Sequence, residues 1–221
     1  MRDFDAIYQI AADRKGGAEA LERLLSKPLR APELLAKSDD RWLSAMAKCL
    51  FQAGFNWQVI TAKWDGFEAT FEGFDPAKVA FYHDEDLDRL LADKTIVRNG
   101  AKISAVIDNA RFVRDLASEH GSAGAFFANW PNSDYIGLLQ VIAKRGSRLG
   151  GITGQRMLRS MSRDSFILTE SVTARLIAES VAGKSPSSKR EMAAVQEAFN
   201  TWSTQSGRSL TEISQVLAYS I

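Results

Sequence analysis

The sequence predicts an all-α protein, and three observations lead to this prediction. Apolar residues recur along most of the chain at spacings of three and four, as on one face of a helix, rather than at alternate positions. The chain contains only five prolines, and all of them lie near segment boundaries. Of its 221 residues, 45% are hydrophobic and 25% charged, which is the composition of a globular protein rather than of a disordered or fibrous one.

The first predicted helices have recognisable start and stop residues. Asp39 opens a helix with an apolar face, and Gly54 is placed to end it. Asn56 is expected to cap the next helix. Asp75, followed by a proline, and Asp84 are expected to open two shorter helices.

The longest regular pattern covers residues 102–116 and predicts a central helix. Its apolar residues keep to one face, and we assign Lys102, Asp108, Arg111 and Arg114 to the opposite, polar face. Further helices are expected over residues 134–144, 155–163, 165–182 and 189–206, and a last one from the capping box that begins at Ser209.

The cysteine and histidine counts exclude two kinds of site. The single cysteine, Cys49, forms no internal disulfide, and with His83 and His120 it does not complete a four-ligand zinc site of the usual kind. We therefore expect no metal, no cofactor and a reducing compartment. The first residues lack the plan of a secretory signal, and no run of about 18 apolar residues predicts a membrane span. The expected location is the cytoplasm.

Charge is unevenly distributed along the chain. The net charge is only +1, which taken alone argues against a nucleic-acid partner. Residues 65–93, however, hold nine acidic and two basic residues, a net charge of −7, whereas residues 141–190 hold ten basic and three acidic ones, a net charge of +7. DNA would be attracted to the second segment and repelled by the first, which orients binding. The alternative is two solvated helix faces of opposite charge that pack as neighbours.

Glycines and basic residues gather in the turn between two of the predicted helices. We expect residues 134–163 to form a helix-hairpin-helix, because backbone N–H groups at the start of its second helix can bind a DNA phosphate where glycine leaves the approach open. The alternative is a plain connection between helices. The candidate DNA-binding residues of the turn are Lys144, Arg145, Gly146, Arg148, Gly151 and Thr153.

Several blocks of the sequence carry a family resemblance. They are Phe51–Trp57, Phe67–Phe71, Phe74–Ala80, Ile96–Ile103, Asn109-Ala110 and the turn that begins at Lys144. In order and spacing these blocks resemble the DNA-3-methyladenine glycosylase I family. The resemblance implies one domain over residues 1–221 with the two-lobed, all-helical helix-hairpin-helix DNA glycosylase fold. It also implies that the protein, as a monomer, flips 3-methyladenine out of alkylated double-stranded DNA and hydrolyses its N-glycosidic bond in base-excision repair.

The resemblance also identifies candidate base-binding residues. Trp57 matches the family's tryptophan that stacks on the flipped base, and an aromatic face suits a cationic, alkylated purine. The alternative for Trp57 is a place in the core beside Gly54. Cys49 and Gln52 are further base-binding candidates. Cys49 stands three positions before Gln52, where the family has a glutamate that contacts the base, and a thiol supplies no carboxylate. Tyr8 is a positional candidate for the tyrosine of the family's N-terminal arm.

The segment Arg163–Val172 resembles the wider helix-hairpin-helix glycosylase superfamily, in which an aspartate stabilises the oxocarbenium-like sugar or orients water. Thr169 stands at the place of that aspartate, and the adjacent Glu170 is the candidate catalytic carboxylate, with Asp164 nearby. The alternative for Glu170 is a first-turn acid of a helix. The resemblance places no lysine to form a Schiff base, so we expect a monofunctional glycosylase. The family's zinc ligands are absent from this sequence, and we expect packing to hold the termini instead.

Three interpretations of the function follow. The first is a monofunctional glycosylase that releases 3-methyladenine. The second is a protein of the same fold that binds DNA lesions with altered or lost catalysis, because Cys49 and Thr169 depart from the family pattern. The third is a glycosylase with a different choice of base.

Overall fold

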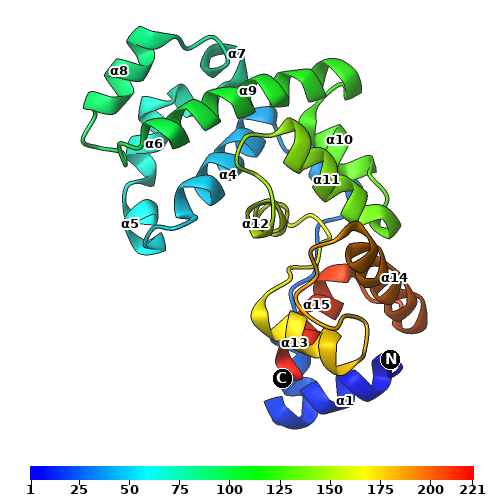
Figure 1. Ribbon diagram of the computed structural model, residues 1–221. Coiled ribbons are helices and arrows are strands. Elements are labelled where there is room, and N and C mark those ends of the chain that lie inside the picture. Colours follow the sequence, from blue (N-terminus) through cyan, green and yellow to red (C-terminus); the bar gives the residue numbers. More distant parts are fainter. The chain divides into compact units, whose positions relative to one another are not determined.

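The computed structural model describes all 221 residues of the chain (Figure 1). Its regular secondary structure is entirely helical, which confirms the all-α prediction. The chain forms two compact units, each built from separate segments. The terminal unit consists of Met1–Leu29, Pro131–Leu138 and Ser162–Ile221, and the central unit consists of Arg30–Trp130 and Leu139–Met161.

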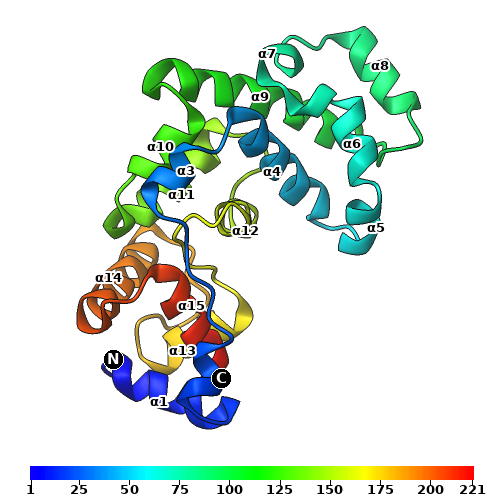
Figure 2. The ribbon, with the colours of Figure 1, turned by 180° about the vertical axis from the view of Figure 1, so that it is seen from behind.

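The central unit contains the longest helix, α9 (Gly100–His120), which packs along α4 (Asp39–Gln52) (Figure 2). The side chain of Asn99 caps α9 by accepting a hydrogen bond from the backbone N–H of Lys102, and Gly121, with φ of 88°, ends the helix. The other helices of this unit are α3 (Ala31–Leu35), α5 (Trp57–Ala62), α6 (Trp64–Thr70), η1 (Glu72–Phe74), α7 (Pro76–Val79), α8 (Asp84–Ala92), α10 (Ala123–Asn129), most of α11 (Tyr135–Arg145) and α12 (Ile152–Ser160).

Helix α4 carries much of the core of the central unit, since α9, α10 and α12 all pack against it. Near its start, the ring of Trp42 stacks on Phe127 of α10 with a centroid distance of 4.2 Å. Near its end, the ring of Phe51 meets Phe67 of α6 at 4.5 Å. All four rings are fully buried, and such aromatic contacts dominate core stability. They fix both ends of α4 and therefore the segment that follows its last residue.

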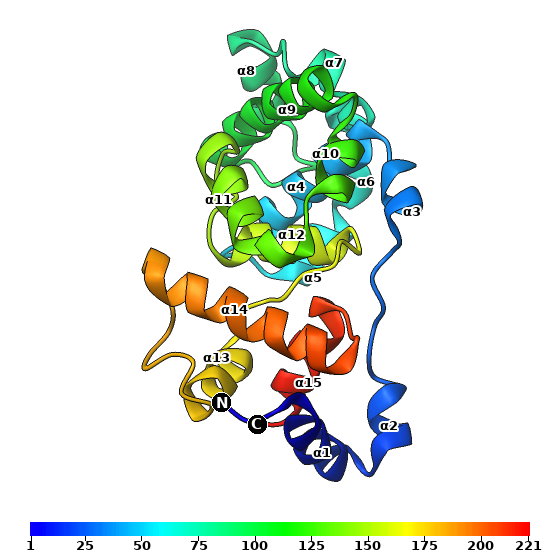
Figure 3. The same ribbon diagram turned by 90° about the vertical axis from the view of Figure 1, so that its right-hand side faces the viewer.

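Both ends of the chain lie in the terminal unit (Figure 3). Four aromatic rings form its core, in the order Tyr135, Phe166, Phe199 and Trp202, with successive centroid distances of 4.6, 4.1 and 5.7 Å. Helix α15 packs against α1, α13 and α14 around this core. The helices of this unit are α1 (Phe4–Lys15), α2 (Ala18–Glu22), η2 (Asn132–Asp134), the first turn of α11, α13 (Glu170–Ala178), α14 (Lys189–Ser206) and α15 (Leu210–Tyr219).

A network of hydrogen bonds and ion pairs joins the two ends of the chain. Glu179, which is buried, accepts from the guanidinium of Arg2 at 2.6 Å and from the backbone N–H of Arg2 at 2.9 Å. Arg175 is also buried; it pairs with Glu179 at 3.3 Å and donates to Ser220 Oγ at 2.7 Å. Phe4, beside the start of the chain, is packed in the core. The termini are thus held by this charged network together with packing.

The helix expected over residues 165–182 is shorter in the structure, where it is α13, because the residues before it are extended. Ser165 N–H donates to Thr211 Oγ at 3.1 Å, and Ile167 N–H donates to Ser214 Oγ at 3.2 Å. Both hydroxyls belong to α15, and they accept hydrogen bonds from N–H groups that would otherwise donate to carbonyls within a helix. This tertiary pairing is not visible in the spacing of apolar residues.

Other differences are smaller. Helix α12 begins at Ile152 rather than at residue 155, because Gly151 already serves as its N-cap. The sequence patterns also did not identify α1, α2, α3, α6 or α10. None of the helices has both the length and the apolar character needed to cross a membrane.

Candidate functional site

In the segment after α4, every second residue from Phe55 to Val59 has a large, exposed apolar side chain. Phe55, Trp57 and Val59 are 40%, 47% and 46% exposed. Asn56 caps α5 by accepting from the N–H of Gln58 at 2.9 Å, which places Trp57 at the first helical position. Trp57 therefore does not fill the core, and about half of its side chain is exposed to solvent.

A guanidinium lies over the ring of Trp57. Arg156, on α12, has its Cζ 4.9 Å from the ring centroid, within the range of a cation–π interaction. Sequence reasoning assigned no role to Arg156, because neither its spacing nor its neighbours in the chain indicate a contact with an aromatic residue. Helix α12 packs on α4, and this tertiary contact brings Arg156 to Trp57.

Cys49 and Gln52 lie in the last turn of α4, in the same unit as Trp57. Cys49 is buried, and its Sγ lies 4.0 Å from Ser160 Oγ. Burial raises the pKa of the Cys49 thiol, although Arg156 and Lys48 lower it by their charge. The thiol is therefore neutral near pH 7, and it brings no negative charge to this part of the unit.

Lys102 is buried, which corrects its assignment to the polar face of the central helix. Its Nζ donates to two carbonyl oxygens at the end of α4, those of Phe51 at 3.1 Å and Ala53 at 2.6 Å, and lies 4.4 Å from the ring centroid of Phe55. Desolvation, and the charge of Arg148, lower the pKa of Lys102. Carbonyls at a helix end lack partners within the helix, so Lys102 satisfies them and holds the segment that leads to Trp57.

The turn between α11 and α12 leaves the start of α12 accessible. Gly151 is its N-cap, with φ of 58° and ψ of −136°, a conformation that favours glycine, and no side chain caps the helix. Gly151 and Ile152 are exposed. At Gly154 a Cβ would lie 2.4 Å from the carbonyl oxygen of Leu149, so the turn packs this closely only with glycine there. The start of α12 therefore has no side-chain cap and can offer backbone N–H groups to an anion.

Asn109 holds this turn from α9. Its side chain is fully buried, its Nδ2 donates to the carbonyl of Ser147 at 3.0 Å, and its Oδ1 accepts from the N–H of Ser147 at 2.7 Å. A paired amide contact of this kind replaces both hydrogen bonds that the backbone of Ser147 would make with water. Asn109 therefore fixes the position of the turn relative to the helix that also carries Lys102.

The basic residues of the turn differ in how free their charges are. Lys144 and Arg148 are exposed. Arg145 forms a two-pronged ion pair with Glu119 at 2.8 and 2.7 Å, so much of its charge is compensated. Gly146 and Thr153 are half-buried within the turn region. Lys144 and Arg148 are thus the side chains best suited to meet a phosphate.

Two predicted site residues lie in the terminal unit. The hydroxyl of Tyr8, on α1, donates to Glu22 Oε1 at 2.7 Å. Glu170 is exposed in the first turn of α13, and Thr169 caps that helix by accepting from the N–H of Val172 at 3.2 Å. The base-binding role of Tyr8 and the catalytic role of Glu170 stay predictions.

Asp164, which lies six residues before Glu170 in the sequence, binds the backbone at the start of α15. It is buried and accepts from the backbone N–H groups of Leu210 and Thr211 at 3.2 and 2.9 Å, at the start of α15. Arg163 and Arg175, which contribute to the charge of the basic segment, are also buried. Two of the three acids of the segment, Asp164 and Glu179, are buried as well. The side chains of the segment that are not buried therefore still carry a net charge of +7.

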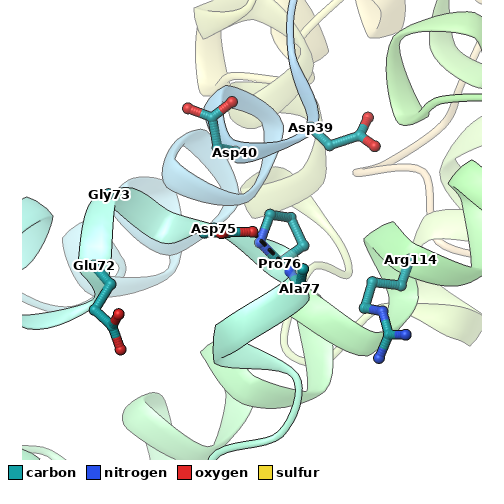
Figure 4. A pocket seen from close by; sticks show the side chains of 8 residues that line it. All are labelled: Asp39, Asp40, Glu72, Gly73, Asp75, Pro76, Ala77 and Arg114. Atoms are coloured by element: carbon teal, nitrogen blue, oxygen red, sulfur yellow. Dashed lines mark hydrogen bonds between the residues drawn. The ribbon is translucent and has the colours of Figure 1, made fainter.

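An acidic hollow of about 530 Å³ lies at the start of α4 (Figure 4). Its carboxylates have structural partners: Asp39 accepts from the N–H of Ala123 at 2.8 Å, and Asp75 caps α7 through the N–H of Ala77 at 2.9 Å. Because α4 has 14 residues and rises about 1.5 Å per residue, the hollow and Trp57 lie at opposite ends of a helix roughly 20 Å long. It is lined by Asp39, Asp40, Glu72, Gly73, Asp75, Pro76, Ala77 and Arg114.

No three His, Cys, Asp or Glu side chains converge where they could hold a metal ion.

The profile of the methyladenine glycosylase family matches residues 35–145, which include α4, Trp57, α9 and the start of the turn. This match covers half of the chain. The chain belongs to the methyladenine glycosylase family.

Two relatives match this chain over a shorter stretch. DNA-3-methyladenine glycosylase 1 of Escherichia coli is 45% identical over 60 residues, and DNA-3-methyladenine glycosylase of Haemophilus influenzae is 32% identical over 60 residues. Each match covers 27% of this chain and 32% of the relative, so it spans about a third of the length of these proteins.

Solved structures support the fold of this family member. A crystal structure of 3-methyladenine DNA glycosylase I superposes with a TM-score of 0.50 at 24% identity, over 57% of this chain and 79% of that one. The enzyme from Staphylococcus aureus gives 0.51 at 21% identity, over 62% and 80%. A variant in complex with 3-methyladenine gives 0.52 at 23% identity, over 62% and 81%. The all-helical glycosylase fold is therefore shared.

Proposed function

We propose that this protein is a monofunctional DNA glycosylase that releases 3-methyladenine from alkylated double-stranded DNA. The observation that carries the proposal is the exposed ring of Trp57 in the family-matched region, in one compact unit with an uncapped helix start and free basic side chains. Both relatives reported above are named for this activity. Its biological setting would be base-excision repair.

The exposed ring explains how a base would be held. A base within a duplex is out of reach, so the nucleotide must be extruded, and the extruded purine can then stack on Trp57. The contacts of Asn56 and Lys102 fix the segment that carries this ring, so little ordering is needed when the base arrives.

The turn between α11 and α12 explains how the DNA backbone would be held. The N–H groups at the start of α12 meet a phosphate with the favourable end of the helix dipole, and Lys144 and Arg148 add charge. We propose that residues 134–163 act as the helix-hairpin-helix, with Arg145 contributing less because of its pair with Glu119.

The chemistry asks little of the protein when the base is alkylated. The bond between C1′ and N9 breaks, its electron pair neutralises the positive charge of the leaving 3-methyladenine, and a water oxygen bonds to C1′ and loses a proton. A carboxylate such as Glu170 would stabilise the developing sugar cation.

The free thiol of Cys49 is consistent with a reducing compartment such as the cytoplasm. The Trp57 segment and the turn belong to one chain, which is consistent with a monomer.

The second candidate is a lesion-binding protein with lost or altered catalysis. Two observations favour it: Cys49 is a neutral buried thiol, and Thr169 caps a helix instead of offering a carboxylate.

Incubation with methylated DNA separates the two candidates, with chromatography of the released bases and a parallel binding assay on the same DNA. Release of 3-methyladenine above the protein-free rate supports the glycosylase. Retained binding without any release rejects it and leaves the lesion-binding protein.

A further inference from the structure

Four cations of the central unit interact with the ring of Trp57, with Cys49, with the end of α4 or with one another. Arg156 lies over the ring of Trp57, and the charges of both Arg156 and Lys48 act on Cys49, in the last turn of α4. Arg148 acts in turn on Lys102, which holds the segment before Trp57. None of these four cations takes part in an ion pair, so their charges are not compensated by carboxylates.

Glu68 and Lys48 both contact Trp64, but Glu68 is paired with Arg41. Lys48 Nζ lies 5.1 Å from the ring centroid of Trp64, whose Nε1 donates to Glu68 at 3.1 Å. Glu68 is bound by both terminal nitrogens of Arg41 at 3.0 and 2.9 Å. Its charge is therefore compensated by Arg41, and Glu68 does not pair with Lys48.

A guanidinium over the ring of Trp57 affects two kinds of base differently. A purine alkylated at N3 carries a positive charge before its bond breaks, so a guanidinium on the same ring repels it. A neutral purine instead takes the electron pair of the C1′–N9 bond onto N9 as it leaves and becomes negative. A nearby guanidinium stabilises that charge, and its N–H groups suit a carbonyl oxygen on the base.

We infer that Arg156 determines the choice of base and extends it to neutral purines that carry a carbonyl oxygen, such as hypoxanthine. This inference rests on the proposed function, in which Trp57 is the platform for the base. In the reaction, the C1′–N9 bond breaks with its electron pair on the base, a water oxygen bonds to C1′, and the proton lost by that water neutralises the base. The reaction needs no oxidant, reductant or further reactant.

Arg156 fits this role better than the other cations do. It is half-buried, so its charge is screened less than that of a fully exposed arginine. The Nζ of Lys102 already donates hydrogen bonds to the carbonyls of Phe51 and Ala53. Only Arg156 lies on the ring itself, where a base would stack, and its planar group keeps N–H donors at its edge.

The test compares two substrates under single-turnover conditions, methylated DNA and a duplex with one hypoxanthine. The rate of release of 3-methyladenine is measured for the first, and that of hypoxanthine for the second. The proteins are the wild type, Arg156→Gln, Arg156→Lys and the matched control Arg114→Gln. Arg114 also lies over an aromatic ring, that of Phe81 at 4.5 Å, but it lines the acidic hollow at the other end of α4. Urea unfolding checks that each variant is folded.

We expect the wild type to release both bases. Arg156→Gln should lower the ratio of the hypoxanthine rate to the 3-methyladenine rate at least tenfold, Arg156→Lys should restore part of that ratio, and Arg114→Gln should leave the ratio at the wild-type value. An equal loss of both rates in folded Arg156→Gln overturns the inference. So does a wild type that releases 3-methyladenine and no hypoxanthine, which leaves the proposed function standing. A wild type that releases neither base overturns the proposed function and the inference with it.

Discussion

Lys102 and Asn109 lie seven residues apart on the same buried face of α9, and each side chain hydrogen-bonds the backbone of a different loop. Lys102 holds the segment before Trp57, and Asn109 holds the turn before α12. At a rise of 1.5 Å per residue, the two side chains leave the helix about 10 Å apart. One rigid helix thus sets the spacing between the candidate base platform and the candidate phosphate site.

Replacing Lys102 by Met keeps the length of the side chain and removes its three donors. The carbonyls of Phe51 and Ala53 then lose their partner, so we expect a loss of about 1–3 kcal/mol in the free energy of unfolding. Urea denaturation measures this loss, with the exposed Lys94→Met as control. An unfolding midpoint equal to that of the wild type would contradict the role assigned to Lys102.

Asn109→Ala should release the turn without touching the Trp57 segment. We expect about 1–3 kcal/mol of destabilisation and weaker binding of undamaged DNA, because Ser147 loses both contacts to α9. The double variant with Lys102→Met should show additive losses within about 0.5 kcal/mol, since the two sites share no partner. A coupling energy well above that value would show that the two loops depend on each other.

The burial of these two residues could be read from the sequence only in part. Lys102, Val106, Asn109 and Val113 follow one another at spacings of four, three and four, which puts all of them on the apolar stripe. A lysine at the first turn of a helix is nevertheless more often exposed, and only the carbonyls at the end of α4 make its burial favourable.

Helix boundaries with a local capping residue were predicted well, and the contacts between helices were not. Helix boundaries at Asn56, Asp75 and Ser209 follow from local capping, which the sequence displays directly. The cation over Trp57 depends on how α12 packs against α4, and 99 residues separate Arg156 from Trp57. No local pattern encodes such a contact.

The stability of the α6–α8 region should depend on acidity through Asp93. Hydroxyls of Thr70 and Thr95, and the N–H of Thr95, donate to this carboxylate at 2.6 to 2.7 Å and lower the pKa of Asp93 to about 2. Because the folded state favours the ionised form, this stabilisation is complete above the ordinary pKa near 4 and is lost as the pH falls toward 2.

Melting temperatures measured from pH 5 to pH 2 check this expectation. Asp93→Asn should melt at a lower temperature than the wild type at pH 5, and the difference should shrink as the pH approaches 2. Asp88→Asn, an exposed residue of α8, serves as the control and should follow the wild type. A difference between Asp93→Asn and the wild type that is constant with pH would show that the carboxylate charge is not involved.

Trp57→Ala tests the base platform. Stacking on an aromatic ring contributes about 1–3 kcal/mol per base, so we expect release of 3-methyladenine to fall between about 5-fold and 150-fold. Binding of undamaged DNA should change much less, because no base is extruded there. Trp57→Phe keeps a ring and should retain most of the activity, whereas equal losses of release and of undamaged-DNA binding would mean that Trp57 is not a platform.

Lys144→Gln combined with Arg148→Gln tests the phosphate site. Glutamine keeps most of the side-chain length, and at Arg148, where φ is 57°, it leaves the backbone cost of that conformation nearly unchanged. Each lost phosphate contact should flatten the dependence of log K on log salt by about one unit, for every DNA sequence alike. The matched control is Lys78→Gln with Arg114→Gln beside the acidic hollow, where DNA is repelled, and its salt dependence should equal that of the wild type. If the control flattens the slope and the turn variant does not, the DNA backbone is bound at the other end of α4.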